Sequence, residues 1–452
     1  MKFYSTNNPP SHKATEGKKI HFVDFRTALL QGLALDGGLF MPERFPKLNK
    51  KFLKDISKKE FWKIALEISK GFIKDIPERE LKKMLKDAFN FEVPLKKINE
   101  NLYILELWHG PTLAFKDFGA RFMARLMNYY LRREKEKLNI IVATSGDTGS
   151  AVAQGFYGLS NIKVFVLYPS KRITALQEKQ MATLGKNIVS LEVKGNFDDC
   201  QKLAKQILAD KDLKEKINLS SANSINFGRL LPQSFYYFYG YAQLLNKLKV
   251  KSEKLKVIYC VPSGNFGNLT AGLMAKQMGL PVKQFIAATN ANDIVPQYLR
   301  TGKFVSRVSC KTISNAMDVG NPSNFARMLE MFHGDVKQMR REIIGFGVSD
   351  KQTRETIKNV YRKTGYILDP HTAVGIAAAR KSNILQPIIV LSTAHPAKFR
   401  EAVEPVISKK ISLPPQLKKI INKAKKATLV ENNVETVKRI ILEKYGHIKK
   451  TA

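Results

Sequence analysis

The chain has 452 residues, which is enough for two or three domains with substantial buried cores. A hydrophobic fraction of 44% and a charged fraction of 25% are those of a folded globular protein and exclude a largely disordered chain. The formal net charge of +37 at pH 7 suggests an anionic partner. The lysines, however, are dispersed among acidic residues as on a solvated surface, so we expect no nucleic-acid binding.

Cysteine usage and hydropathy limit the class of protein further. Cys200, Cys260 and Cys310 are far apart and form no CxxC pair, which argues against both a zinc site and a disulfide framework. The opening residues MKFYSTNNPP lack the apolar core of a secretory signal. No run approaches the roughly 18 apolar residues that span a bilayer. We therefore expect a cytoplasmic protein without a membrane contact or a bound metal.

Local patterns divide the chain near residue 100. Residues 1–95 alternate turn signals with amphipathic stretches such as FWKIALEISKGF, which predicts a mostly helical amino-terminal region. Beyond it, NIIVAT (139–144), the loop SGDTG, a helix and KVFVLYP (163–169) form one βαβ unit. LKVIYCV (255–261), the loop PSGNFGN, a helix and VKQFIAAT (282–289) form another. Apolar strands alternating with helices predict parallel sheets covered on both faces, in two α/β lobes.

Two loops that follow these strands are candidate anion sites, because ligands collect at the carboxyl ends of parallel strands. SGNFGN, Ser263 to Asn268, offers glycines and helix-start amides that suit a phosphate, although a plain strand-to-helix turn fits it equally well. It matches neither GxGxxG nor GxxxxGK[ST], which removes the usual support for NAD and ATP. In TSGDTG, the donors of Ser145 and Thr148 suit a carboxylate, whereas Asp147 fits a helix cap equally well.

A third loop is STAHPAKF, after the strand PIIVL. The hydroxyl of Thr393 either faces a ligand across a cleft or bonds to the local backbone, and the local bond is the commoner arrangement. His395, His371 and His109 have no metal-ligand spacing between them. We interpret these three histidines as structural, or as residues that support the site without touching a ligand.

Taken together, the motifs resemble one family. HGPTLAFKDFGARFMARL (109–126) is similar to the lysine motif of the threonine synthase family, pyridoxal phosphate enzymes of the fold type that includes the tryptophan synthase β subunit. MKFYSTN, GLALDGGLFMPE, ATSGDTG, SANSINFGRL, SGNFGN, DPHTAVG and STAHPAKF resemble the same family, in its order, from residue 1 to about 405. Leu35 departs from the family's APDGGL string, at a place far from the chemistry.

The resemblance implies two open, mostly parallel-sheet α/β lobes with the cofactor in the cleft between them. We expect residues 1–95 to form the family's amino-terminal region, 96–230 the lobe with the lysine and the SGDTG loop, and 231–452 the lobe with the SGNFGN and STAHP loops. Lys116 would form the Schiff base with pyridoxal 5'-phosphate. Flanking aromatic residues would desolvate its amine and lower its pKa.

The remaining site residues also follow from the resemblance. The cofactor phosphate would be held by Gly264, Asn265, Phe266, Gly267 and Asn268. Thr393 would contact the pyridine nitrogen, where many other pyridoxal enzymes place a carboxylate. The substrate carboxylate would be received by Ser145, Asp147 and Thr148. A second anion site, for a phosphate monoester, would consist of Asn223, Ser224, Asn226 and Arg229.

The implied reaction converts O-phospho-L-homoserine and water to L-threonine and phosphate by γ-elimination and β-addition of water, the last step of threonine biosynthesis. The alternative within this fold is a serine or threonine dehydratase or a sulfhydrylase, and the second anion site argues against it. The alternative of a catalytically silent relative conflicts with the intact Lys116 and SGNFGN loop. The oligomeric state is left open.

Overall fold

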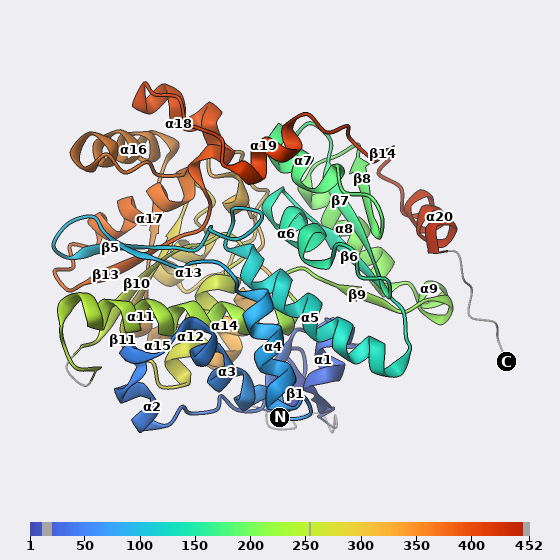
Figure 1. Ribbon diagram of the computed structural model, residues 1–452, viewed down its shortest axis with the longest axis horizontal. Helices are drawn as coiled ribbons and strands as arrows, with labels where there is room; N and C mark the ends of the chain where they lie inside the picture. Colours follow the sequence, from blue (N-terminus) through green and yellow to red (C-terminus); the bar gives the residue numbers. More distant parts are fainter. Residues whose placement is uncertain (11–19, 253–254, 446–452) are drawn as a thin grey trace.

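Two parallel sheets form the framework of the protein (Figure 1). The computed structural model describes residues 1–10, 20–252 and 255–445. In spatial order the larger sheet contains β12 (Ile343–Gly347), β11 (Val282–Thr289), β10 (Val257–Pro262), β13 (Ile388–Ser392), β5 (Leu102–Glu106) and β4 (Leu95–Lys97). The smaller sheet contains β14 (Ala427–Val430), β8 (Ile188–Val193), β7 (Ile162–Pro169), β6 (Leu138–Ala143) and β9 (Leu219–Ser221). Only the edge pair β4 and β5 is antiparallel within these two sheets, so the predicted α/β fold class is confirmed.

Both predicted βαβ units are present. In the smaller lobe β6 leads through α6 (Asp147–Phe156) to β7, and in the larger lobe β10 leads through α12 (Gly267–Gln277) to β11. All residues of β6 and β10 are buried, which explains their continuous apolar sequences: helices cover both faces of each sheet. The loop after each strand therefore opens a helix at the sheet's carboxyl edge, where ligands collect.

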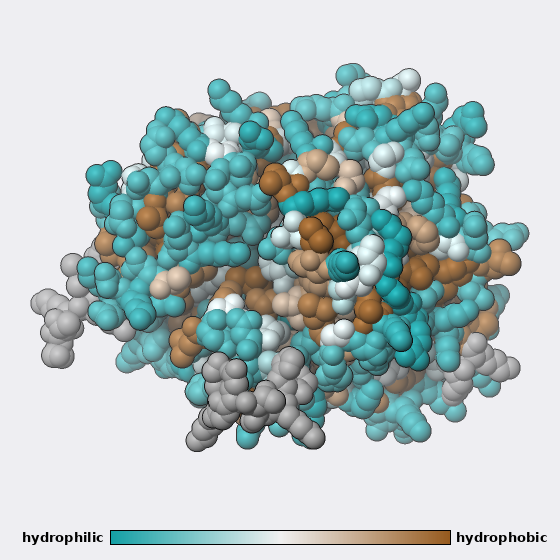
Figure 2. All heavy atoms as spheres, turned by 180° about the vertical axis from the view of Figure 1, so that it is seen from behind, coloured by the Kyte–Doolittle hydropathy of each residue, from teal (hydrophilic) through white to brown (hydrophobic). Residues whose placement is uncertain are grey.

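Further helices complete the two lobes. They are α5 (Lys116–Glu134), α7 (Ala175–Ala182), α8 (Phe197–Ala209), α9 (Lys211–Lys216), α10 (Phe227–Leu230), α11 (Phe235–Leu248), α13 (Ile294–Thr301), α14 (Phe325–Met331), α15 (Val336–Glu342), α16 (Asp350–Thr364), α17 (Pro370–Lys381), α18 (Arg400–Ile407), α19 (Pro415–Ile421) and α20 (Val434–Tyr445). Hydrophilic residues cover most of the face seen in Figure 2, with hydrophobic residues between them. Among the described residues no helix is both long and apolar enough to cross a membrane.

The amino-terminal region packs against helices α5 and α11 (Figure 1). Its helices are α1 (Phe25–Gln31), α2 (Lys50–Lys54), α3 (Phe61–Phe72) and α4 (Glu78–Ala88). In α3 the buried Ile64, Ile68 and Phe72 are spaced four residues apart, so they form one apolar face toward the core. A small antiparallel sheet of β2 (Val23–Asp24), β1 (Lys2–Ser5) and β3 (Phe40–Pro42) accompanies the predicted helices.

The chain passes between the lobes more often than the predicted division at residues 96–230 and 231–452 allows. Strand β5, just before the lysine motif, belongs to the larger sheet and pairs with β13. Near the end of the chain, β14 pairs with β8 of the smaller sheet, and Figure 1 shows the red carboxyl-terminal segment passing from α18 by way of α19 to β14 and α20. Both crossings depend on pairing between segments far apart in sequence, which local hydrophobic patterns do not specify.

A fully buried arginine ties the amino-terminal sheet to the lobes. The guanidinium of Arg327, on α14, donates to the carbonyl oxygens of Phe40, Ser224 and Ile225 and to Oδ1 of Asn324. Burial lowers its pKa to about 9. The guanidinium thus satisfies backbone carbonyls from two segments that are far apart in the sequence.

We expect Arg327→Met to destabilise the protein by about 3 kcal/mol or more, because several buried hydrogen bonds of the guanidinium are lost together. Thermal unfolding monitored by circular dichroism measures the change. Arg354→Met is the matched control, since Arg354 is exposed on α16 and its loss costs no more than about 0.5 kcal/mol. Equal melting temperatures for the two variants would contradict the structural role of Arg327.

Candidate functional site

The lysine motif and the STAHPAKF segment meet beyond the ends of two adjacent strands. β5 and β13 are parallel neighbours, and past their carboxyl ends the chains form a short antiparallel contact between Ala114 and Ala394. The amide of Phe115 donates to the carbonyl of Thr393 at 2.9 Å, and the amide of His395 donates to the carbonyl of Leu113 at 3.0 Å. This contact brings Lys116, the first residue of α5, and Thr393 to the same cavity.

The SGNFGN loop forms another wall of this cavity. Phe266 adopts a left-handed conformation with φ of 58°, which ends the loop and starts α12. The amides in the first turn of α12 have no acceptor within the helix, so they are available to an anion. The Nδ2 atom of Asn268 is buried without a partner among the described residues, while its Oδ1 accepts from the hydroxyls of Tyr236 and Tyr237. The loop therefore presents donors to the cavity it lines.

Gly264 permits the close packing that closes this wall. A Cβ atom on Gly264 would lie 2.7 Å from Cα of Met317 and 3.0 Å from the carbonyl oxygen of Ala316. The amide of Ala316 donates in turn to Nε2 of His371, whose Nδ1 contacts Oδ1 of Asp369 at 2.8 Å. His371 thus carries its proton on Nδ1 and supports the segment that covers the glycine loop.

The cavity has a volume of about 100 Å³ and collects most of the predicted residues. The predicted residues that line it are Lys116, Ser145, Thr148, Asn223, Ser224, Arg229, Gly264, Asn265, Phe266, Gly267, Asn268 and Thr393. Two others lie behind the lining. The side chain of Asn226 caps α10, accepting from the amide of Gly228 and donating to the carbonyls of Leu29 and Ser221.

The surroundings of Lys116 lower the pKa of its amine and so make it a better nucleophile. Burial lowers the pKa of Lys116 to about 8; the carboxylate of Asp147 opposes this shift, and the charges of Arg229 and Lys398 add to it. About a tenth of the amine is therefore neutral at pH 7, far more than for an exposed lysine, and the neutral form is the one that attacks a carbonyl. Of the flanking aromatic residues, Phe115 has its ring centroid 6.0 Å from Nζ of Lys116.

Asp147, the second predicted residue outside the cavity lining, is held by charge and hydrogen bonding. Its Oδ1 accepts from Nζ of Lys398 at 2.6 Å and from Nε2 of Gln177 at 3.0 Å. Burial raises the pKa of this carboxyl, but Lys398 and Lys116 outweigh burial and bring it to about 2. Asp147 is thus an anion and the first residue of α6, although its side chain does not bond an amide as a cap.

Arg229 supplies a buried positive charge to the same cavity. Its Nη1 donates to the carbonyl of Ala222, and its Nε has no partner among the described residues. Burial lowers the pKa of Arg229 to about 10, with the charge of Asp117 opposing the shift, so the guanidinium remains protonated at neutral pH. A Cβ atom at Gly119 would lie 2.7 Å from Nε of Arg229, so the glycine in the lysine motif makes room for this arginine.

Asn223 and Ser224 link the smaller lobe to the glycine loop. The side chain of Asn223 bonds both the amide and the carbonyl of Ala143, at the end of β6. Oγ of Ser224 accepts from Nδ2 of Asn265 at 3.0 Å and from Nδ2 of Asn324 at 3.1 Å. These bonds place both residues at the cavity wall and leave the hydroxyl proton of Ser224 available to an acceptor.

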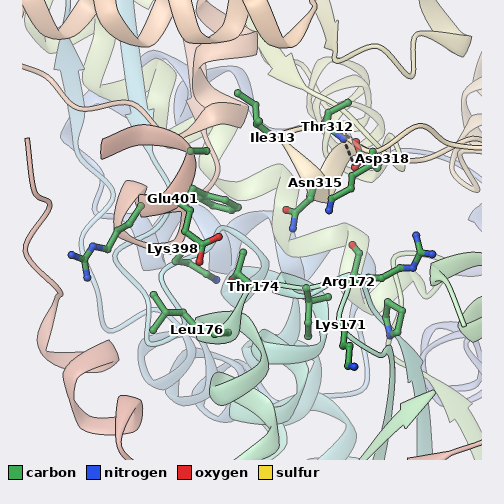
Figure 3. Close-up of a pocket in the computed structure, with 18 of the residues that line it drawn as sticks. Lys171, Arg172, Thr174, Leu176, Thr312, Ile313, Asn315, Asp318, Lys398 and Glu401 are labelled. Atoms are coloured by element: carbon green, nitrogen blue, oxygen red, sulfur yellow. Dashed lines mark hydrogen bonds between the residues drawn. The ribbon is translucent and has the colours of Figure 1, made fainter. Parts of the chain in front are cut away.

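A wide cleft of about 1230 Å³ lies between the lobes and shares Ser145 with the small cavity. Figure 3 shows its two sides facing each other, with Thr174 and Leu176 on one side and Ile313 and Asn315 on the other. Basic residues along it are Lys171, Arg172, Lys179, Lys311, Lys398, Arg400, Lys409 and Lys410. The described residues contain no group of three or more histidine, cysteine and acidic side chains suited to a metal.

Sequence reasoning missed one residue of the site, Lys398. It lies within the motif STAHPAKF, but nothing local distinguishes it from the other lysines. Its nearly complete burial separates it from surface lysines, and that burial is apparent only in the tertiary structure. His371, also nearly completely buried, accepts from the amide of Ala316 and so has the supporting role that was expected of it.

Comparisons with known proteins agree with this geometry. A family model for pyridoxal-phosphate dependent enzymes matches residues 87–392, one for the threonine synthase N terminus matches 11–89, and one for the threonine synthase C-terminal part matches 372–441. The chain is 45% identical to threonine synthase of Buchnera aphidicola (subsp. Acyrthosiphon pisum) over 93% of its own length and 97% of the relative. It is 43% identical to threonine synthase of Escherichia coli over 87% of its own length and 91% of the relative.

Solved structures give the same result. The crystal structure of threonine synthase from Escherichia coli superimposes with a TM-score of 0.90 at 39% identity, covering 98% of this chain and 100% of that one. Pyridoxal-phosphate-bound threonine synthase from Brucella melitensis gives a TM-score of 0.90 at 34% identity, covering 99% of this chain and 100% of that one. The family expected from the motifs is therefore confirmed: the chain belongs to the threonine synthase family of pyridoxal-phosphate-dependent enzymes.

Proposed function

We propose that this enzyme converts O-phospho-L-homoserine and water to L-threonine and phosphate, with pyridoxal phosphate bound at Lys116. The observation that carries the proposal is one cavity lined by an amine of lowered pKa, a glycine loop that opens a helix, and a buried arginine. An enzyme acting on unphosphorylated serine or threonine needs the first two of these features but has no use for the third.

The residues present fit pyridoxal phosphate. Helix-start amides and the unpartnered Nδ2 of Asn268 suit its phosphate, and the hydroxyl of Thr393 is a neutral donor suited to a ring nitrogen. When bound, the cofactor supplies an electron sink that stabilises negative charge on the substrate carbons. Because Thr393 does not impose a positive charge on the ring, the protein's own bases contribute more to the direction of proton transfer.

Lys116 is proposed to move the protons. Its pKa of about 8 lies near neutral pH, where a lysine both accepts and donates protons efficiently. Set free when the substrate amine takes its place, the amine would remove a proton at the α carbon and exchange one at the β carbon. The buried surroundings exclude bulk water from this exchange.

The substrate's two anionic ends are assigned to different walls. Ser145 and Thr148, with the first amides of α6, are proposed to hold the carboxylate. Arg229, with Asn223 and Ser224, is proposed to hold the phosphate as it leaves from the γ carbon. Asp147 carries a negative charge between Ser145 and Thr148, so it serves this site indirectly rather than as a ligand of the carboxylate.

The wide cleft is the proposed entry path of the substrate. The basic residues along the wide cleft favour the approach of a doubly anionic substrate toward Ser145. We keep the cytoplasm as the proposed location, since Cys200, Cys260 and Cys310 are all free thiols.

We expect Lys116→Ala to form no detectable threonine and to lack the absorbance band of lysine-bound pyridoxal phosphate. The reason is that no other cavity-lining side chain carries an amine. The measurements are threonine formation from O-phospho-L-homoserine and the absorption spectrum of the purified protein. Lys358→Ala, exposed on α16 and outside the cleft, is the control and should retain both properties. Native turnover in Lys116→Ala would end the assignment.

We expect Arg229→Met to lower kcat/KM for O-phospho-L-homoserine by about 100-fold, the loss of roughly one strong charged hydrogen-bonding group. Arg229→Lys, which keeps the charge but loses the planar fork, should lie between that variant and the native enzyme. Steady-state kinetics and cofactor titration are measured on each protein. If cofactor binding weakens as much as kcat/KM, Arg229 supports the fold rather than the substrate phosphate.

A further inference from the structure

Lys398 forms a buried ion pair that crosses between the two lobes. It lies in a short 3-10 turn, Pro396–Phe399, in the segment that follows β13 of the larger sheet. Its Nζ contacts Oδ1 of Asp147, the first residue of α6 in the smaller lobe, at 2.6 Å, and also donates to the carbonyl of Thr112 at 3.0 Å. Both charged side chains are at least 96% buried.

The pair is the centre of a longer polar chain beside Lys116. From the smaller lobe, Nε2 of Gln177 donates to Asp147 and Nε2 of Gln180 donates to the carbonyl of Thr112. Thr112 in turn donates from its amide and its hydroxyl to the two carboxylate oxygens of Asp117, at 2.9 and 2.7 Å. Asp117 immediately follows Lys116 in α5, so this series of hydrogen bonds connects helix α7 to the position of the reactive lysine.

Stability does not explain this arrangement. Removing two charges from water is costly, and an apolar pair of the same volume usually stabilises a protein equally well or better. The position of the pair gives a different reason. Asp147 stands between Ser145 and Thr148, the proposed carboxylate donors, where an unneutralised negative charge would repel a substrate that is itself anionic.

We propose that Lys398 is a positioning residue for the reaction, a role that rests on the proposed function. Its ammonium group clamps Asp147 and Thr112 across the cleft, so that the donors of the SGDTG loop and the amine of Lys116 are held in one arrangement. It also cancels the charge of Asp147 next to the place assigned to the substrate carboxylate. Lys398 does not line the small cavity and acts through its contacts with Asp147 and Thr112.

The charges around Lys116 agree with this role. The charged groups that act on it are Asp147, Arg229 and Lys398, and burial is the largest influence on its pKa. Loss of Lys398 alone would leave Arg229, among the described groups that act on Lys116, as the one remaining positive charge that opposes Asp147, and would favour the protonated amine. Loss of both charges of the pair would leave the net charge near Lys116 unchanged.

The test compares Lys398→Met, Asp147→Asn, the double variant and the control Lys358→Met, which removes one exposed positive charge on α16, outside the cleft. Three quantities are measured. The first is kcat/KM for O-phospho-L-homoserine. The second is the rate at which the apoprotein captures pyridoxal phosphate as a function of pH, followed by absorbance. The third is the melting temperature. The second and third need no substrate.

Native apoprotein should show a capture rate that rises through an inflection near pH 8, because only the neutral amine reacts. In Lys398→Met the inflection should move up by about one pH unit, kcat/KM should fall by about 100-fold, and the melting temperature should drop. The double variant should regain the native inflection and most of the melting temperature, because no unpaired charge remains. Its kcat/KM should stay at least about tenfold low, because the clamp is absent.

A Lys398→Met protein whose kcat/KM stays within about threefold of native overturns the proposal. A double variant that regains native kcat/KM also overturns it, because the pair would then serve only to balance charge and not to hold the two lobes in position. Failure of both variants to fold would make the pair structural and overturn the positioning role. Absence of threonine formation by the native enzyme would reject the proposed function alone, and the capture rates and melting temperatures would still decide whether the pair controls Lys116.

Discussion

The pairing of β5 with β13 is the constraint on which the site depends. It sets two segments nearly three hundred residues apart side by side, and their continuations meet at Ala114 and Ala394. From that contact Lys116 begins α5 and Thr393 faces the same cavity. The SGNFGN loop reaches the cavity from β10, the other neighbour of β13. Three chemical functions, an amine, a neutral donor and an anion cradle, thus rise from adjacent strands of one sheet, as is usual for ligands at the carboxyl edge of parallel strands.

Charge is distributed over this framework according to burial. The charges of Asp147 and Arg229 both act on the pKa of Lys116, and Lys116 in turn acts on the pKa of Asp147. All three groups are buried, so water is largely excluded from them. Low polarity makes each charge more effective than it would be at the surface. The amine is driven toward neutrality, whereas the carboxylate and the guanidinium keep their charges because a partner or a very high intrinsic pKa outweighs burial. The net charge of +37 plays no comparable role, since most of it is spread over the solvated surface.

Much of this could be predicted from sequence. The two βαβ units follow from apolar runs and glycine-containing loops, and the motifs named most of the residues that line the cavity. The boundaries of the lobes could not be predicted, because β5 and β14 find partners through long-range pairing. Asn226 was expected to bind the substrate phosphate together with its neighbours in SANSINFGRL, yet its side chain caps α10 instead. Lys398 was hidden among the many lysines, since only the folded chain shows that it is buried against Asp147.

The most direct measurement is the product balance of the purified, cofactor-loaded native enzyme with O-phospho-L-homoserine. Threonine and inorganic phosphate should appear in equal amounts, because the phosphate leaves the γ carbon and water adds at the β carbon of the same molecule. Oxobutyrate in place of threonine would mean elimination without addition of water. That outcome, or no release of phosphate at all, would contradict the assignment of the cavity to this reaction.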